Sequence, residues 1–170
     1  MKKDFFQIKN FLPSYIIQKL LKDINFEIKN NFCPNVPKFQ TYSNLFEKYK
    51  EQDEWIFYFN KLDKQIKTIF VESNKVFKLD KCWANSVQSK STYSIHTHGE
   101  NILSTVYFVK NTYKEFGTYF NKDNYEFIAP GYENSLIIFK GNIPHSTTMP
   151  PEVLCKEDYR ITLTTDFYYE

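Results

Sequence analysis

Three histidines are the residues of this sequence best suited to chemistry. They are the only histidines among its 170 residues, at positions 96, 98 and 145. Alternate residues of a β-strand point to the same side, so His96 and His98 would face one point on a strand. Imidazole nitrogens bind Fe(II), Zn(II) and related metals, and a third ligand from a distant strand leaves coordination positions open for substrates. The spacing therefore predicts one metal ion held by His96, His98 and His145.

Glu100 offers a second way to complete the ligand set. His98, Gly99 and Glu100 form an H-x-E pattern, so His98, Glu100 and His145 would make the set of two histidines and one carboxylate used by non-heme iron oxygenases. A short H-x-H pattern also occurs in strands that bind no metal, where the histidines are ordinary polar residues. The residues by themselves leave these alternatives open.

The elements that must position the histidines are strands in the second half of the chain. From Val76 onward, short runs rich in Tyr, Phe, Val, Ile and Thr are separated by Asn, Gly, Asp and Pro, a pattern typical of β-strands. Eight strands are predicted, at Cys82–Ser89, Thr92–His98, Ile102–Lys110, Gly117–Asn121, Glu126–Ala129, Ser135–Lys140, His145–Thr148 and Tyr159–Tyr168.

Helices are predicted in the first half. Apolar residues recur at helical spacing over 15–24, after a start at Pro13 or Ser14, and again over about 53–73. Prolines and asparagines over 30–39 predict a loop. We therefore expect a mainly β fold, a double-stranded β-helix of the jelly-roll or cupin-like type braced by two N-terminal helices.

Length and composition indicate a single domain over 1–170, in which 1–80 supplies helical support and entry strands and 81–170 supplies the β-helix core. The 22 Lys and Arg nearly balance the 20 Asp and Glu, so we expect no nucleic-acid partner. The sequence shows no signal segment, no apolar stretch of membrane length and no paired cysteines. We expect a soluble, cytoplasmic protein with no membrane partner; its oligomeric state is open.

Five short motifs, in order, resemble the prolyl-hydroxylase type of 2-oxoglutarate/Fe(II) oxygenase, and most closely a branch of small oxygenases with an H-x-H, H and R pattern. They are Trp83-Ala-Asn85, His96-Thr-His98, Ser104-Thr-Val106-Tyr107-Phe108, Pro144-His145-Ser146 and Arg160-Ile161-Thr162. Phe11-Leu12-Pro13 before the first helix is similar to the entry of such proteins, so the resemblance spans nearly the whole chain. Each motif alone is weak, but five in one order are specific.

The resemblance implies a metal-ligand role for His96 and His145, and His98 stands where many relatives have aspartate. Tyr93 matches a tyrosine that contacts the co-substrate in prolyl hydroxylases. That register favours His98 over Glu100 as the third ligand.

The resemblance also implies a co-substrate pocket. Arg160 matches the arginine that pairs with the distal carboxylate of 2-oxoglutarate, for which a guanidinium provides a bidentate fork. Thr162, on the same strand face, and Asn85 would add polar contacts. Two features depart from the family pattern: Phe108 replaces a tyrosine, and the stretch between His145 and Arg160 is longer than in many relatives, which implies an inserted loop.

The function implied by the resemblance is that of an enzyme using Fe(II), 2-oxoglutarate and O2. It would hydroxylate a C–H bond of a peptidyl substrate, a prolyl one included, or of a small molecule. A cupin-like metal enzyme without 2-oxoglutarate and a non-catalytic β-barrel binding module are the alternatives. Loops over 34–41 and 148–158 are candidate gates, and the sequence does not identify the substrate.

Overall fold

The computed structural model describes residues 4–30, 39–41, 44–71, 74–88, 94–122, 125–148 and 159–170. The helices are α1 (Ser14–Asn30), α2 (Leu45–Tyr49) and α3 (Asp53–Ile69). The strands are β1 (Phe5–Lys9), β2 (Phe39–Gln40), β3 (Phe77–Gln88), β4 (Ile102–Asn111), β5 (Thr118–Lys122), β6 (Tyr125–Ala129), β7 (Ser135–Lys140), β8 (His145–Thr147) and β9 (Tyr159–Tyr169).

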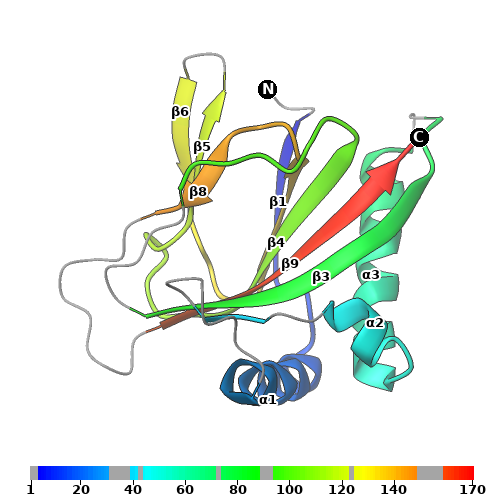
Figure 1. The fold of residues 1–170 in the computed structure, drawn as a ribbon, viewed down its shortest axis with the longest axis vertical. Coiled ribbons are helices and arrows are strands. Elements are labelled where there is room, and N and C mark those ends of the chain that lie inside the picture. The colour runs from blue at the N-terminus through cyan, green and yellow to red at the C-terminus, as the bar shows by residue number, and fades with distance from the viewer. Residues whose placement is uncertain are drawn as a thin grey trace.

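The strands form two antiparallel sheets. The large sheet has the order β1-β7-β4-β9-β3-β2, and the small sheet has the order β6-β5-β8. The helices lie against one side of the large sheet and the small sheet lies against the other (Figure 1). This arrangement agrees with the predicted mainly β fold braced by N-terminal helices.

The side of the large sheet that faces the helices is an apolar core. Successive strand residues point to opposite faces, so alternate residues such as Tyr107 of β4 and Leu163 of β9 meet the helices. The helices present apolar stripes at helical spacing, with Leu20 of α1 and Trp55 and Leu62 of α3 fully buried. This packing fixes the position and twist of the strands whose other face carries the candidate site.

The side of the large sheet that faces the small sheet is partly polar. A smaller apolar cluster there includes Phe108 of β4, Phe139 of β7 and Phe120 of β5. Beside it runs a row of buried residues at alternate positions of β9: Arg160, Thr162, Thr164 and Asp166. The two sheets thus enclose polar side chains next to an apolar wall.

The structure corrects several sequence-based boundaries. The predicted strand Thr92–His98 is wrong in its described part, because 94–98 contains one isolated bridge, at His96. The segment is followed by Gly99, whose φ of 121° lies in the region that favours glycine, and by a turn at Glu100 and Asn101. Strand β3 begins at Phe77 rather than Cys82, and α3 ends at Ile69 rather than Ser73.

Three short elements had no predicted bounds: β1 and β2, which correspond to the entry strands expected only in general terms, and α2. The loop predicted over 30–39 lies mostly outside the described residues, and Asn30 itself belongs to α1.

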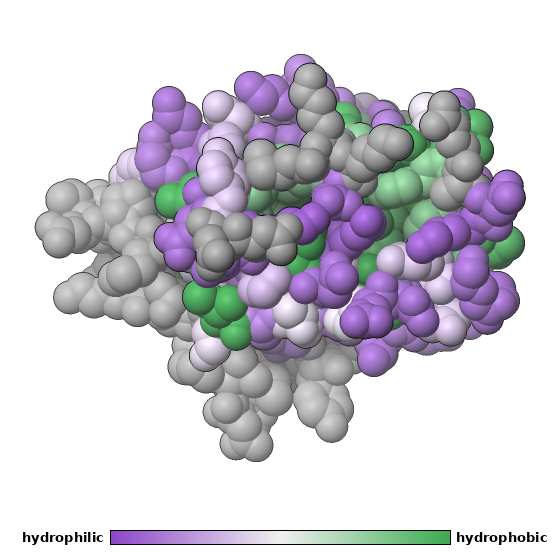
Figure 2. All heavy atoms as spheres, turned by 90° about the horizontal axis from the view of Figure 1, so that it is seen from above, coloured by the Kyte–Doolittle hydropathy of each residue, from purple (hydrophilic) through white to green (hydrophobic). Residues whose placement is uncertain are grey.

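Seen from above, polar side chains are dispersed over the surface and apolar residues show between them (Figure 2). Val71, Val76 and Tyr168 are among the large apolar residues exposed to solvent. None of the helices in the described part of the chain combines the length and apolar character needed to cross a membrane.

Candidate metal centre

The three histidines converge between the two sheets. One ligand atom from each of His96, His98 and His145 lies within 4.8 Å of the others, and the ring centroids are 4.5–5.3 Å apart. Backbone pairing produces this convergence. His96 and His145 exchange two N–H···O bonds of 3.0 Å, and the N–H of His98 donates to the carbonyl of Gly141 at 2.7 Å.

The ring orientation of His96 and His145 is set by backbone carbonyls. Nδ1 of His96 lies 2.8 Å from the carbonyl oxygen of Ser94, and Nδ1 of His145 lies 2.8 Å from that of Ile143. A carbonyl oxygen can only accept, so both Nδ1 atoms carry a proton, and in the neutral ring the lone pair is then on Nε2. This is the tautomer that binds a metal through Nε2.

The ring orientation of His98 is set by a carboxylate instead of a backbone carbonyl. Its Nδ1 lies 2.8 and 2.9 Å from the two carboxylate oxygens of Asp166. The hydroxyl of Ser104 donates to the same carboxylate at 2.7 Å. Three imidazoles whose Nδ1 atoms are oriented by hydrogen bonds and whose ligand atoms lie close together form a donor set that fits a divalent metal such as Fe(II) or Zn(II).

His145 is the buried member of the set. It is 5% exposed and packs against the rings of Phe139 and Phe120, at centroid distances of 4.6 and 6.0 Å. Burial lowers the pKa of His145 to about 4, partly opposed by its hydrogen bond to the Ile143 carbonyl. The ring is therefore neutral near pH 7, as a metal ligand must be.

Glu100 lies apart from this group. It is exposed, and it lies in the turn that follows Gly99, past the segment that carries His96 and His98. Its backbone carbonyl accepts a hydrogen bond of 2.8 Å from the hydroxyl of Tyr169. Among the described residues, the cluster able to hold a metal consists of His96, His98 and His145.

A cavity of about 240 Å³ opens beside the histidines. Residues of β2, β3, β4, β5, β8 and β9 line it, most of them polar. Pockets for drug-sized ligands usually span about 300–1,000 Å³, so this cavity suits a smaller molecule.

Arg160 lies buried in the wall of that cavity, 3% exposed. Its Nη1 donates to the hydroxyl of Thr147 at 3.3 Å and its Nη2 to the hydroxyl of Thr118 at 3.4 Å. The guanidinium also lies 4.9 Å from the centroid of the Phe108 ring. The ring of Phe108 thus packs on the arginine.

The other predicted co-substrate residues divide into two groups. Asn85 and Thr162 are opposite each other in the β3–β9 register and both line the cavity. The side-chain amide of Asn85 donates to the hydroxyl of Thr164 at 3.2 Å. Tyr93 lies outside the described residues, as do 34–38 and 149–158 of the predicted gates.

Sequence reasoning missed Asp166 and gave no role to Ser104. Both contact His98. Asp166 is two strand alternations beyond Thr162, so the period of two that placed Arg160 and Thr162 on one face could have found it. Trp83, quoted only as part of a motif, also lines the cavity, with its ring 5.7 Å from that of His98.

No family model and no curated protein matches the sequence. Solved structures match it closely in fold. A prolyl-4-hydroxylase from Pseudomonas putida superposes with a TM-score of 0.70 at 15% identity, covering 97% of this chain and 92% of its own. A prolyl hydroxylase from Trichoplax adhaerens, solved with a hypoxia inducible factor peptide, gives 0.67 at 11% identity over 98% and 84%.

The non-heme α-ketoglutarate-dependent epimerase SnoN of nogalamycin biosynthesis gives a TM-score of 0.74 at 9% identity, over 98% of this chain and 79% of its own. These likenesses, at low identity, establish the fold. The prediction of a double-stranded β-helix is confirmed.

Proposed function

We propose that this protein is an Fe(II)- and 2-oxoglutarate-dependent oxygenase that hydroxylates a C–H bond. One observation carries the proposal: three histidines bring their ligand atoms within 4.8 Å of one another, beside a small cavity that a buried arginine also lines. The fold shared with a prolyl-4-hydroxylase and with an α-ketoglutarate-dependent epimerase supports it.

In this proposal His96, His98 and His145 hold Fe(II). Three protein ligands leave coordination positions for the co-substrate and O2. Bound together, Fe(II), 2-oxoglutarate and O2 supply the oxidising chemistry, in which 2-oxoglutarate becomes succinate and carbon dioxide while a C–H bond becomes C–OH.

Arg160 holds the distal carboxylate of 2-oxoglutarate. Its guanidinium is buried and is already oriented by the hydroxyls of Thr147 and Thr118. A charge-assisted pair in such a site is stronger than one in water. Thr162 and Asn85 add a hydroxyl and an amide to the same cavity.

The remaining residues orient the reactants and limit water. The rings of Phe120 and Phe139 cover His145 on the inner side. His96 is the exposed ligand, so the substrate approaches from its side. Exclusion of water on the buried side directs the oxidant to the substrate.

A peptidyl substrate, a prolyl one included, and a small molecule both fit this proposal. The prolyl hydroxylase that binds a peptide supports the first class, and the biosynthetic epimerase supports the second. One fold hosting both classes means that the substrate is decided by residues around the site.

The test is succinate formation from 2-oxoglutarate with and without Fe(II) and O2. The wild type should form succinate only with both. His98→Ala should lose this activity, whereas Glu100→Ala should keep it as a matched control two residues away. Retention of activity in His98→Ala with loss in Glu100→Ala would refute the three-histidine set.

The same assays separate the alternative functions. A metal-dependent activity that does not require 2-oxoglutarate and persists in Arg160→Ala would favour the cupin-like alternative. Absence of metal binding would favour a non-catalytic binding module.

A further inference from the structure

A buried carboxylate stands behind one of the three histidines. The side chain of Asp166 is 10% exposed, as is that of His98. Both its oxygens lie within 2.9 Å of Nδ1 of His98. Ser104, directly opposite Asp166 in the β4–β9 register, donates its hydroxyl to the carboxylate at 2.7 Å.

Burying a carboxylate on a central strand of a sheet costs free energy. Removing an ion from water costs several kcal/mol unless hydrogen bonds replace the lost hydration. On β9 Asp166 is flanked by Thr165 and Phe167, both buried on the helix-facing side. The hydrogen bonds from Ser104 and His98 offset the cost, and both donors belong to the candidate metal centre or touch it.

Asp166 also differs in charge from the groups that orient the other two histidines. Nδ1 of His96 and Nδ1 of His145 donate to neutral backbone carbonyls, whereas Nδ1 of His98 donates to an anion. An anionic acceptor makes the opposite ring nitrogen a more basic ligand. The three ligands are therefore unequal, and His98 is the most electron-rich.

We propose that Asp166 is a positioning residue of the metal centre. Through its hydrogen bond to His98, it places near the metal the negative charge that a carboxylate ligand would otherwise have supplied. This inference rests on the proposed metal site. A set of two histidines and one carboxylate carries one negative charge next to the metal, and a set of three neutral histidines carries none. With Asp166 held on Nδ1, the charge sits one ring farther out. Ser104 fixes the carboxylate so that Nε2 of His98 faces the metal.

The row of polar residues on β9 carries opposite charges at its two ends. Arg160 and Asp166 lie on the same face, six residues and roughly 20 Å of strand apart. The anion lies at the metal end of the row, and the cation lies at the end that receives the co-substrate carboxylate. Each charge complements the one that the proposed function brings next to it.

The experiment compares Co(II) affinity in four full-length proteins: wild type, Asp166→Asn, Ser104→Ala and Asp23→Asn. Asparagine keeps an acceptor for Nδ1 of His98 and removes the charge. Loss of an outer partner of a ligating histidine typically weakens metal binding about 10–100-fold, which we expect for Asp166→Asn. Ser104→Ala should have a smaller effect in the same direction.

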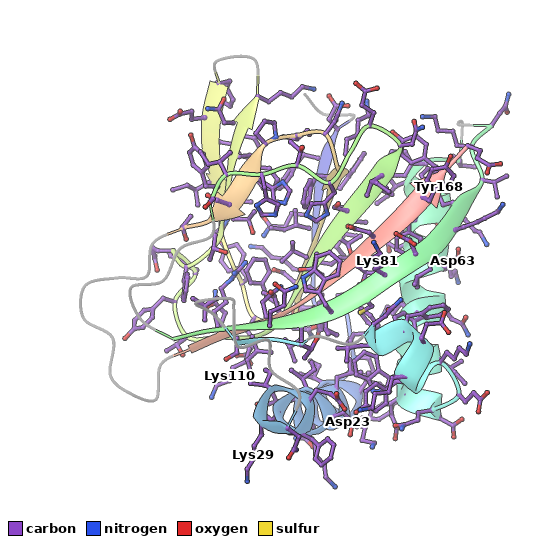
Figure 3. All side chains as sticks on the ribbon, viewed as in Figure 1. Asp23, Lys29, Asp63, Lys81, Lys110 and Tyr168 are labelled. Carbon is purple, nitrogen blue, oxygen red and sulfur yellow. The ribbon has the colours of Figure 1, made fainter. Side chains whose placement is uncertain are left out.

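Asp23 is the matched control. Its carboxylate is 13% exposed, pairs with Lys19 and accepts a hydrogen bond of 3.0 Å from Trp55. It lies on α1, on the helix side of the large sheet (Figure 3). Asp23→Asn should change the melting temperature without changing Co(II) affinity.

Two further readouts separate positioning from general stability. The visible d–d spectrum of bound Co(II) should shift in Asp166→Asn, and the Fe(III)/Fe(II) midpoint potential of the iron-loaded protein should rise, because the lost charge stabilised the more positive ion. Wild-type Co(II) affinity and spectrum in Asp166→Asn would overturn the inference, as would equal losses in Asp166→Asn and Asp23→Asn. Failure of the wild type to bind Co(II) would overturn the metal site itself.

Discussion

The two faces of strand β9 carry different kinds of residue. Residues facing the helices are Ile161, Leu163, Thr165 and Phe167, and residues facing the small sheet are Arg160, Thr162, Thr164 and Asp166. All eight are buried. One strand therefore supplies the apolar core on one side and the polar lining of the site on the other.

Polar groups on the two faces also have different surroundings. On the helix side, the hydroxyl of Thr165 donates to the sulfur of Cys82 at 3.4 Å and lies 3.1 Å from the hydroxyl of Tyr58. On the other side, Thr162 and Thr164 border a cavity. The comparison indicates that changes on the helix face should alter stability, whereas changes on the cavity face should alter ligand binding.

The largest expected effect is that of Leu163→Ala. Leu163 is fully buried against the helices, and truncation of a buried leucine lowers the free energy of unfolding by about 2–5 kcal/mol. Urea denaturation should measure this loss. The Co(II) affinity of the folded fraction should be unchanged, and a large drop in that affinity would contradict the division between the two faces.

Arg160→Ala should produce the next effect, on the cavity face. Hydrogen bonds to charged groups contribute about 1.5–3 kcal/mol, so the dissociation constant for 2-oxoglutarate should rise at least about tenfold. Calorimetric titration of the Co(II)-loaded protein would measure it. Co(II) binding itself should stay at the wild-type level. Equal 2-oxoglutarate affinity in wild type and variant would show that Arg160 does not bind the co-substrate.

A pair of Thr→Val substitutions sharpens the comparison, since each removes one hydroxyl from β9. Thr165→Val should lower the free energy of unfolding by about 1 kcal/mol and leave 2-oxoglutarate binding intact. Thr162→Val should weaken 2-oxoglutarate binding several-fold with little effect on unfolding. Thermal unfolding and 2-oxoglutarate titration of both proteins would measure these effects. The reverse pattern would show that the faces have been assigned the wrong way round.

The smallest effect concerns a contact that joins the two sheets. Asp4 pairs with Lys122 at the end of β5 and Lys140 at the end of β7. The hydrogen bond from Lys122, then that from Lys140, lowers the pKa of Asp4 from 3.8 to about 2. A lowered carboxyl pKa stabilises the folded state above the unfolded pKa, and this stabilisation is lost as the pH falls through the folded value.

Asp4→Asn should therefore be less stable than the wild type at neutral pH, and the difference should shrink as the pH falls from 3.8 toward about 2. Chemical denaturation across this range would check it. A difference that stays constant with pH would mean that the ion pairs do not stabilise the fold.

Sequence patterns predicted the long elements because their periodicity is strong. Apolar and aromatic-rich runs place β4, β7 and β9, and helical spacing places α3 and the start of α1, within a few residues of their bounds. The segment around His96 shows the limit of that method. Alternation predicts a strand there, but in the described part, residues 94–98, the backbone pairs at His96 with His145 and through the N–H of His98 to Gly141.

For the site, residue types and spacing predicted the three histidines, and the family resemblance predicted Arg160, Thr162 and Asn85. The histidines converge in the structure, and Arg160, Thr162 and Asn85 line the cavity beside them. Neither the spacing nor the resemblance could predict the partner of His98. Asp166 lies 68 residues away in sequence. The β4–β9 register sets it opposite Ser104, and the segment that precedes β4 brings His98 into contact with both side chains. Such a contact depends on register, which short motifs do not encode.

Anaerobic titration with Fe(II) followed by 2-oxoglutarate tests the central claim most directly. Binding of the keto acid to iron held by the three histidines should produce a visible metal-to-ligand charge-transfer absorption in the wild type. Fe(II) alone should not produce it, and His145→Ala should lack it. No such absorption in the folded wild type, or an undiminished one in His145→Ala, would contradict the account.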